Sequence, residues 1–334
     1  MDESEVPKSG YDWSGAGMRW MAGMLALAAY ALAGYALVDL VRPDAGYFSV
    51  SFAILQPAVL CAFAAWMGDP HFRRESRYYL RVPAYLMIGM WAISIPILKE
   101  GTICVIMLSP IWLASGAAGT LLLRRMRRKL GDGAPANRMH ALGIAALPLV
   151  IFPLEMALPT PEADYRVERS VIIDASPRAI WPLMRGMKRI AEDEGAFNFS
   201  QDIAGLPRPL EAELEGEGVG ARREGFWEKG IRFAEVVDRW EVHREIGWVF
   251  DFGDSAGWEF TDAHLNPGSK HMQIRRGGYR LERLAGGKQR LTLHTDYTAR
   301  THLNSYAALW GELFLGDISK NLLETIRQRA EAQS

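Results

Sequence analysis

The fold of the second half of this chain is decided by residues 166–181, which read RVERSVIIDASPRAIW. Residues 166–174 alternate in polarity and include several branched side chains, which is typical of a strand. Ser176 and Pro177 then predict a helix start, with serine as the cap and proline at the first helical position. Apolar residues recur at helical spacing after that point: Ile180, Leu183, Met184, Met187 and Ile190.

Downstream of this helix the sequence predicts a run of antiparallel strands followed by one long helix. Turns rich in glycine separate the candidate strands, which are 210–214, 221–227, 231–240, 246–252, 258–263, 271–284 and 289–301. Residues 304–332 carry an apolar stripe at helical spacing, from Leu309 to Ile326. The simplest packing is a curved sheet that grips the terminal helix. Such a sheet leaves a concave apolar space, where small ligands bind.

Upstream of Pro159-Thr160-Pro161 the composition changes to five apolar stretches: 20–38, 47–67, 82–98, 102–123 and 140–158. A helix needs roughly 20 apolar residues to span the hydrocarbon core of a membrane. We therefore expect a polar N-terminal tail over 1–17, a membrane domain of about five transmembrane helices over 18–160, and a globular domain over 165–332. The predicted fold class is an α-helical transmembrane bundle plus an α+β domain.

Basic residues predict the orientation of the membrane domain. One connecting segment holds Arg73, Arg74, Arg77 and Arg81, and another holds Arg124, Arg125, Arg127, Arg128, Lys129 and Arg138. With five spans both segments lie on one face, which the positive-inside rule makes cytoplasmic. The N-terminus is then cytoplasmic and the globular domain periplasmic, in a bacterial inner membrane. If 140–158 is not a span, the globular domain stays in the cytoplasm.

Composition excludes several classes of function. The 334 residues have a formal net charge of −1 and no strongly basic face, so nucleic acid is a poor candidate partner. Cys61 and Cys104 both lie in apolar stretches, so the globular half has no thiol nucleophile and no disulfide framework. The acidic Glu155 is expected at the headgroup boundary. No repeated acid or matched pair of broken helices suggests a transport pathway.

Two glycine motifs in the globular half are better explained as turns than as sites. Residues 253–257 read GDSAG and fit the G-x-S-x-G pattern of hydrolases, but a strand is predicted to follow, whereas a nucleophile elbow requires a helix. Gly216, Gly218 and Gly220 resemble a phosphate loop, yet no helix N-terminus follows to hold a phosphate.

The histidines of the globular half have no metal-ligand spacing, and no metal or cofactor is predicted. His294 shares a strand face with Thr292 and Asp296, and a His–Asp pair can transfer protons. The alternate face, with Leu291, Leu293, Thr295 and Tyr297, is more apolar and should line the cavity. We therefore expect His294 to point outward into solvent, and we assign no catalytic residue.

Aromatic and apolar side chains are the better candidates for a ligand site. The predicted cavity residues are Trp248, Phe250, Phe252, Tyr279, Leu293, Tyr297, Trp310 and Phe314. Arg222, Arg239 and Arg275 lie on predicted strands and could pair with a polar head group. Solvated strand faces are the simpler explanation for these three arginines.

Three segments together resemble the START-like SRPBCC superfamily. Residues 171–181 resemble its opening strand and Ala-Ser-Pro helix cap, and residues 218–222 (GVGAR) its glycine turn. Residues 290–297 (RLTLHTDY), Trp310 and the helix end at 326–331 resemble its last strand and closing helix. The resemblance covers about 165–331. It implies a helix-grip fold that binds hydrophobic ligands such as lipids, sterols or polyketides, and some members are cyclases or dehydratases.

Three functional hypotheses follow from the sequence. In the first, the START-like domain of an integral membrane protein binds a lipid or polyketide-like ligand beside the bilayer. In the second, the domain is a membrane-tethered cyclase or dehydratase, which requires two polar side chains that converge in the cavity. In the third, it is a ligand-free interaction module with a filled cavity. The expected partners are membrane lipid and a hydrophobic small molecule, and a protein partner is not predicted.

Overall fold

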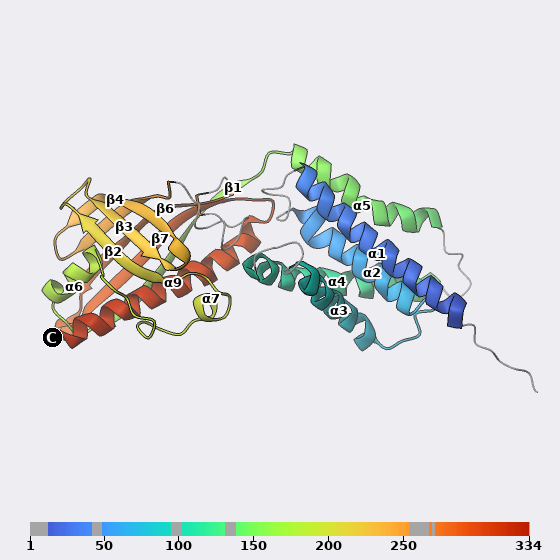
Figure 1. Cartoon of the computed structure of the whole chain (residues 1–334), viewed down its shortest axis with the longest axis horizontal. Coiled ribbons are helices and arrows are strands. Elements are labelled where there is room, and N and C mark those ends of the chain that lie inside the picture. The colour runs from blue at the N-terminus through green and yellow to red at the C-terminus, as the bar shows by residue number, and fades with distance from the viewer. Residues whose placement is uncertain are drawn as a thin grey trace, which may run out of the picture. The chain divides into compact units, whose positions relative to one another are not determined.

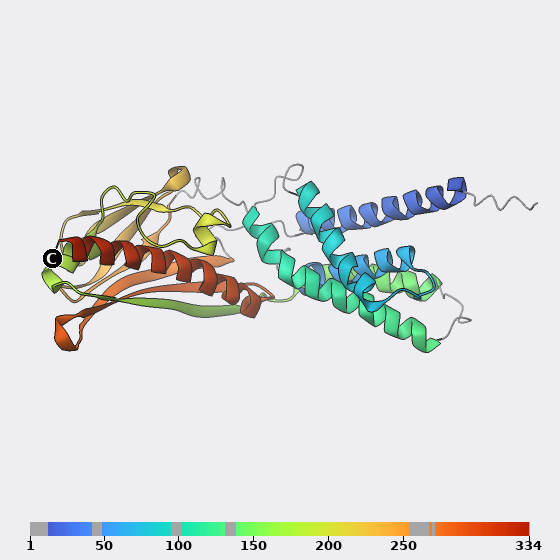
Figure 2. The same ribbon diagram turned by 90° about the horizontal axis from the view of Figure 1, so that it is seen from below.

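The computed structural model describes residues 13–41, 49–94, 102–130, 138–253, 267–268 and 271–333. The chain divides into two compact units, a helical one and a larger one that holds the strands and also includes residues 89–94 and 102–110 (Figures 1 and 2). Residues 1–12 of the predicted N-terminal tail lie outside the described residues, and helix α1 already begins at Trp13.

The first half of the chain is mainly helical in its described residues, with a connecting segment at 69–75 between α2 and α3. Its elements are α1 (Trp13–Val41), a π-helical turn (Ser51–Leu55) that leads into α2 (Gln56–Gly68), α3 (Ser76–Ser94), α4 (Thr102–Leu130) and α5 (Arg138–Ala157). Three segments are long and apolar enough to cross a membrane: Met21–Val38, Ser51–Gly68 and Thr102–Lys129. The apolar part of α5, Gly143–Ala157, is shorter, and α3 is not among the three. The spans at 82–98 and 140–158 therefore stay predictions.

Helix α3 continues through Pro83 because a neighbouring helix supplies the missing hydrogen bond. Proline has no backbone N–H, so the carbonyl group four residues earlier, on Tyr79, loses its helical donor. The Thr120 hydroxyl of α4 donates to that carbonyl oxygen at 2.9 Å. Beside it, Gly119 lies so close to the backbone of Ala58 in α2 that a Cβ atom would clash. Close packing through small residues and satisfied carbonyl groups is what a helical bundle in lipid requires.

The buried carboxylate of Glu155 caps the π-helical turn. Glu155 accepts hydrogen bonds from the backbone N–H of Ser51 at 3.0 Å and from the Ser51 hydroxyl at 2.7 Å. A helix start carries unpaired N–H groups and partial positive charge, so a carboxylate is stabilising there. Glu155 thus has a structural partner, and its depth in a bilayer stays a prediction.

The C-terminal unit is a seven-stranded antiparallel sheet within its described residues (Figure 1). The strands are β1 (Glu162–Ile173), β2 (Pro209–Glu215), β3 (Arg222–Trp227), β4 (Arg232–Glu241), β5 (Glu245–Asp251), β6 (Met272–Arg283) and β7 (Gln289–Arg300). They pair in the order β1-β7-β6-β5-β4-β3-β2. The helices α6 (Pro177–Arg185) and α7 (Phe199–Asp202) connect β1 at one edge to β2 at the other, and the chain returns strand by strand to β7.

The long helix α9 (Asn304–Ala332) lies along the inner face of this sheet (Figure 2). Its Leu323, Ile326 and Ala330 are buried in one core with residues of the sheet and of α6, such as Leu291 and Ile180. The unit therefore has a helix-grip fold, which confirms the architecture predicted from the strand run and the terminal amphipathic helix.

The predicted start of α6 is confirmed, and the helix ends at Arg185, before Met187 and Ile190. The Ser176 side chain accepts a hydrogen bond from the backbone N–H of Ala179 at 3.3 Å, and Pro177 is the first helical residue. The helix ends at Arg185 because Met187 pairs with Ala212 through two backbone hydrogen bonds of 3.0 and 2.7 Å. The apolar residues beyond Arg185 thus follow the sheet edge rather than a helix face.

The segment 254–266 lies outside the described residues. It contains the predicted strand 258–263 and most of the GDSAG motif.

Truncation of the buried stripe of α9 should destabilise the C-terminal unit. Leu323 is 2% exposed, so Leu323→Ala should lower the free energy of unfolding by about 2–5 kcal/mol. Leu309→Ala on the same helix removes a side chain that is 68% exposed and should change it by less than about 0.5 kcal/mol. Urea unfolding of the full chain, followed by tryptophan fluorescence, measures both. Equal effects of the two substitutions would contradict the assigned inner face.

Candidate ligand pocket

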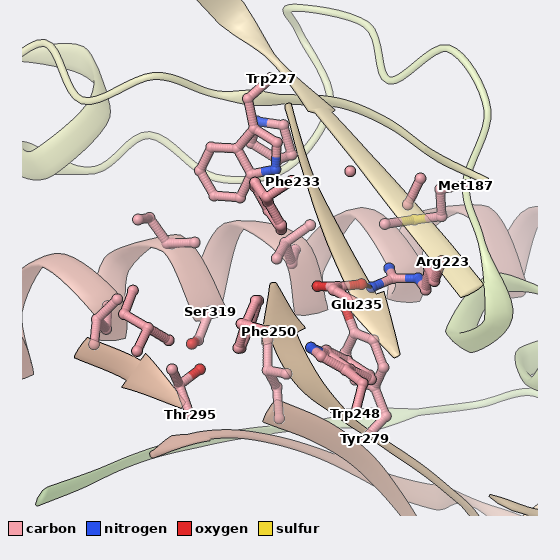
Figure 3. Close-up of a pocket in the computed structure, with 18 of the residues that line it drawn as sticks. Met187, Arg223, Trp227, Phe233, Glu235, Trp248, Phe250, Tyr279, Thr295 and Ser319 are labelled. Atoms are coloured by element: carbon pink, nitrogen blue, oxygen red, sulfur yellow. Dashed lines mark hydrogen bonds and ion pairs between the residues drawn. The ribbon is translucent and has the colours of Figure 1, made fainter. Parts of the chain in front are cut away.

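A pocket of about 100 Å³ lies inside the C-terminal unit, between α9 and the inner faces of the strands (Figure 3). Helix α9 contributes Leu315, Ile318, Ser319 and Leu322, which recur at helical spacing on one face. Strands β2 to β7 contribute the opposite wall, and Met187 and Ile190 line it from the segment after α6. Apolar side chains dominate this lining, as they do in small-molecule sites.

Five of the eight predicted cavity residues line this pocket: Trp248, Phe250, Phe252, Tyr279 and Leu293. Trp248 and Phe250 alternate along β5, so both point inward. The ring of Trp248 lies 5.5 Å from the ring of Tyr279 on the neighbouring strand β6, and Phe250 stacks on Phe252 at 5.6 Å. These contacts form one aromatic wall. Ligand contact by these residues stays a prediction.

The other three predicted residues, Tyr297, Trp310 and Phe314, are not among the residues that line the pocket. Tyr297 is 3% exposed, and Gly311 of α9 lies so close to its ring that a Cβ atom would clash. The Tyr297 ring thus fills the space beside that part of α9. Trp310 and Phe314 pack against each other with 5.3 Å between ring centroids.

Two charged side chains face the pocket from adjacent strands. Arg223 of β3 stands directly opposite Glu235 of β4 in the antiparallel register, and they are only 5% and 4% exposed. The Arg223 Nη1 group donates a hydrogen bond to Glu235 Oε2, and Nε donates to the backbone carbonyl oxygen of Arg185 at 3.0 Å. The guanidinium carbon lies 4.8 Å from the centroid of the Trp248 ring, a cation–π contact. Figure 3 shows the two side chains meeting beside Trp248 and Tyr279.

Burial governs the protonation of these groups. It raises the pKa of the Glu235 carboxyl group above its ordinary value, while the positive charge and hydrogen bond of Arg223 oppose that shift. Burial also raises the pKa of Tyr279 to about 12, so its hydroxyl stays protonated at neutral pH. One end of the pocket therefore combines a guanidinium, a carboxyl group and a phenol. Such groups can donate hydrogen bonds to a ligand and exchange a proton with it.

The indole N–H of Trp248 adds a further donor to this end. It is buried and has no hydrogen-bond partner among the described residues. A buried donor without a partner costs about 1–3 kcal/mol. An acceptor atom on a bound ligand can offset that cost.

The arginine that faces the pocket is not one of the three proposed from the sequence. Arg222, Arg239 and Arg275 are exposed and pair with Glu224, Glu245 and Glu162 at 3.5, 2.6 and 3.5 Å. Successive residues of a strand point to opposite faces, so Arg222 and Arg223 differ completely in environment. Strand alternation could have found the buried pair: Glu235 has the same parity as Phe233 and Val237, which are both buried.

His294 lies on the outer face of the sheet, as expected, but it is half-buried rather than fully in solvent. Gly278 lies opposite His294 on the neighbouring strand β6, and a Cβ atom on Gly278 would lie only 2.8 Å from the imidazole ring. Burial lowers the pKa of His294, and the positive charge of Arg166 acts in the same direction. Asp296 binds Arg166 instead, with two hydrogen bonds of 2.5 and 2.8 Å. The geometry gives no His–Asp proton relay.

Gly216, Gly218 and Gly220 form the turn between β2 and β3, and all three have positive φ angles of 84°, 84° and 91°. Strand β3 follows, so the alternative of a phosphate loop at a helix start is wrong. Among the described residues no group of three or more His, Cys, Asp or Glu side chains is arranged to hold a metal ion.

Comparisons with known proteins give likeness only for the C-terminal half. No protein-family model matches the chain, and no curated protein matches it significantly. Norcoclaurine synthase from Thalictrum flavum is 10% identical and covers 50% of this chain and 98% of its own, with a TM-score of 0.29. The Zhui aromatase/cyclase from a Streptomyces species is 15% identical and covers 50% of this chain and 94% of its own, with a TM-score of 0.32. A START superfamily protein from Mycobacterium smegmatis is 13% identical, with coverages of 51% and 99% and a TM-score of 0.33. The helix-grip assignment therefore rests on strand order and on α9, and these similarities carry no functional conclusion.

Removal of one member of the buried ion pair should destabilise the domain more than removal of both. Arg223→Met leaves Glu235 buried without a partner and should cost about 3–5 kcal/mol of unfolding free energy. The double variant Arg223→Met/Glu235→Leu should recover most of that loss, because no buried charge remains.

Urea unfolding of the four proteins of this cycle measures the coupling. The control is Arg239→Met, which breaks an ion pair whose arginine is 61% exposed and should cost no more than about 1 kcal/mol. A double variant whose loss of unfolding free energy equals the sum of the losses of the two single variants would show that the two side chains are not coupled.

Proposed function

We propose that the C-terminal domain is a START-like domain that binds a hydrophobic small molecule in this pocket, and that the N-terminal helices hold it beside a membrane. The observation that carries the proposal is the pocket between α9 and the sheet, with an aromatic wall and one buried ion pair. A pocket of about 100 Å³ is smaller than the roughly 300–1,000 Å³ typical of sites for drug-sized ligands. The buried part of the ligand is therefore about the size of one or two rings, and a longer lipid tail would extend out of the pocket.

Exposed apolar side chains support membrane attachment. Helices α1 and α5 expose large apolar residues along much of their length: Met21, Leu25 and Leu32 in α1, and Ile144, Val150 and Leu154 in α5, each at least 55% exposed. Apolar faces of this extent are costly in water and favourable in the hydrocarbon core of a bilayer. A tethered domain takes up ligand from the adjacent membrane without a long passage through water, and tethering raises its effective concentration there.

Contacts within the helical unit support the predicted orientation. Arg124 near the end of α4 donates hydrogen bonds to the Ser76 hydroxyl at 2.5 Å and to the Arg74 carbonyl oxygen at 3.1 Å. The two basic segments therefore meet at one end of the bundle. Glu155 near the end of α5 binds Ser51. Ser51 begins the segment formed by the π-helical turn and α2, and the first basic segment follows the other end of it, at Gly68. We propose that the basic end is cytoplasmic and that the chain leaves α5 on the periplasmic side of a bacterial inner membrane.

The ion pair favours a second candidate, a cyclase or dehydratase. Arg223, Glu235 and Tyr279 converge at one end of the pocket, which is the arrangement such an enzyme requires. Glu235 would transfer the proton, and Arg223 would stabilise negative charge that develops on a substrate oxygen. A Glu235→Gln variant separates the candidates. A binding protein would carry the same co-purified compound, whereas a dehydratase would carry a precursor that is heavier by one water.

Blocking the pocket should remove the bound compound. Ile318 lines the pocket from α9, so Ile318→Trp should reduce the load of co-purified ligand by at least about tenfold, because overpacking excludes the ligand. The matched control is Lys320→Trp, on the exposed side of the same helix, which should keep the wild-type load. Mass spectrometry of small molecules extracted from the full chain, purified in nanodiscs, measures the load. An unchanged load in a folded Ile318→Trp protein would refute ligand binding in this pocket.

Membrane orientation should appear in cysteine labelling of intact cells. The native Cys61 and Cys104 are buried, which keeps the background low. Lys288→Cys, in the turn before β7, should react with an impermeant maleimide added outside the inner membrane, and Arg77→Cys should react only after the membrane is opened. The reverse pattern would contradict the proposed orientation, and protection of both sites would rule out the five-span arrangement.

A further inference from the structure

The charges in the pocket wall are few and unevenly placed. Three of the lining residues are charged: Glu211, Arg223 and Glu235. Glu211 is half-buried on β2, whereas Arg223 and Glu235 are almost fully buried opposite each other. The buried pair alone is neutral when both groups are ionised. A ligand in this mainly apolar pocket can therefore form a polar contact with the pair.

The hydrogen bonds of the pair use only part of the donor capacity of Arg223. A guanidinium has five N–H groups; Arg223 donates through Nε to the Arg185 carbonyl oxygen and through Nη1 to Glu235, and it also has a hydrogen bond with the Tyr279 hydroxyl. Glu235 accepts the hydrogen bond from Arg223 through Oε2. The unpaired indole N–H of Trp248 belongs to a ring that lies 4.8 Å from the guanidinium carbon. Donors therefore outnumber acceptors at this end of the pocket.

We propose that Arg223 binds the carboxylate of a compact ring-bearing acid, which replaces Glu235 on the guanidinium while Glu235 takes up one proton. This inference rests on the proposed function of the pocket and specifies the class of ligand. The carboxylate supplies two acceptor oxygens to Arg223, which binds carboxylates in a forked geometry, and to the neighbouring indole N–H. The aromatic wall of Trp248, Phe250 and Phe252 covers the ring.

Charge balance requires the proton. Before binding, the guanidinium charge of +1 and the carboxylate charge of −1 cancel. The incoming ligand adds a charge of −1, and one cation with two anions in a buried site is strongly unfavourable. Protonation of Glu235 from solvent restores neutrality, and its new O–H group can donate a hydrogen bond. No bond other than this O–H bond is formed or broken.

Glu235 is the group that accepts this proton, because the other groups around it are less suited to do so. Arg223 of β3 is permanently charged, and Tyr279 of β6 keeps its own proton at neutral pH. Strand β5 contributes Trp248, and β7 and α9 contribute the hydroxyls of Thr295 and Ser319, none of which is charged. Glu211 of β2 is the other carboxylate in the wall and is more accessible to solvent. The burial of Glu235 raises its pKa, which favours proton uptake further.

Calorimetry with two probes of the same shape tests the inference. The full chain in phosphatidylcholine nanodiscs is titrated with 2-naphthoate and with 2-naphthamide, its uncharged isostere. We expect 2-naphthoate to bind at least about tenfold more tightly than the amide, as an ion pair in a buried site implies. Comparison of phosphate and Tris buffers should show uptake of about one proton with the acid and none with the amide. The acid should bind up to about tenfold more tightly for each pH unit of acidification between pH 8 and pH 6.

Two variants distinguish a failure of this inference from a failure of the proposed ligand binding. Glu235→Gln should still bind the acid, but without proton uptake and with a flat pH dependence. The double variant Arg223→Met/Glu235→Leu should bind the amide and lose the preference for the acid. Equal binding of both probes by the wild-type protein, or proton uptake that persists in Glu235→Gln, would overturn the inference while ligand binding stands. If neither probe binds, the ring-acid assignment fails, and the ligand load of Ile318→Trp decides whether the pocket binds any ligand.

Discussion

The packing of α9 against the inner face of the sheet is the constraint on which the C-terminal unit depends. Its apolar stripe, with Leu323 and Ile326, closes a core that strands β1 and β7 alone would leave open to water. The same helix face continues into Ile318 and Ser319, where the sheet curves away and a pocket remains. Because one helix provides both the core contact and the pocket wall, the stability of the domain and the shape of its pocket are linked.

The register between β3 and β4 determines the chemistry of that pocket. It places Arg223 opposite Glu235 on the inner face, where water is excluded. Buried ion pairs contribute little net stability compared with apolar residues of the same size. Both proposed candidate functions, ligand binding and catalysis, assign this pair a role in ligand recognition or proton transfer. They differ in whether the bound molecule is chemically changed.

The helical half has the close contacts that the proposed bundle in lipid requires. Gly119 approaches the backbone of Ala58, and Thr120 satisfies the carbonyl group that Pro83 leaves unpaired. Large apolar side chains remain on the outside of α1 and α5. The proposed combination of a lipid-facing anchor and a small pocket for an acid suits a ligand that partitions between membrane and water.

The sequence by itself determined the helical nature of the first half and the strand run that ends in an amphipathic helix, because hydrophobic periodicity is a local property. It also indicated Trp248, Phe250 and Tyr279 as inward residues. Strand alternation could have indicated Glu235 as an inward residue, but only the tertiary structure decided its partner and which aromatic rings fill core space. Arg222 and Arg223 are indistinguishable by residue type, and the register with β4 places the second opposite Glu235. Tyr297 has the same inward parity as Leu293, yet the approach of Gly311 on α9 makes it core rather than pocket wall. Such outcomes depend on contacts between residues that are distant in the chain, which local patterns do not specify.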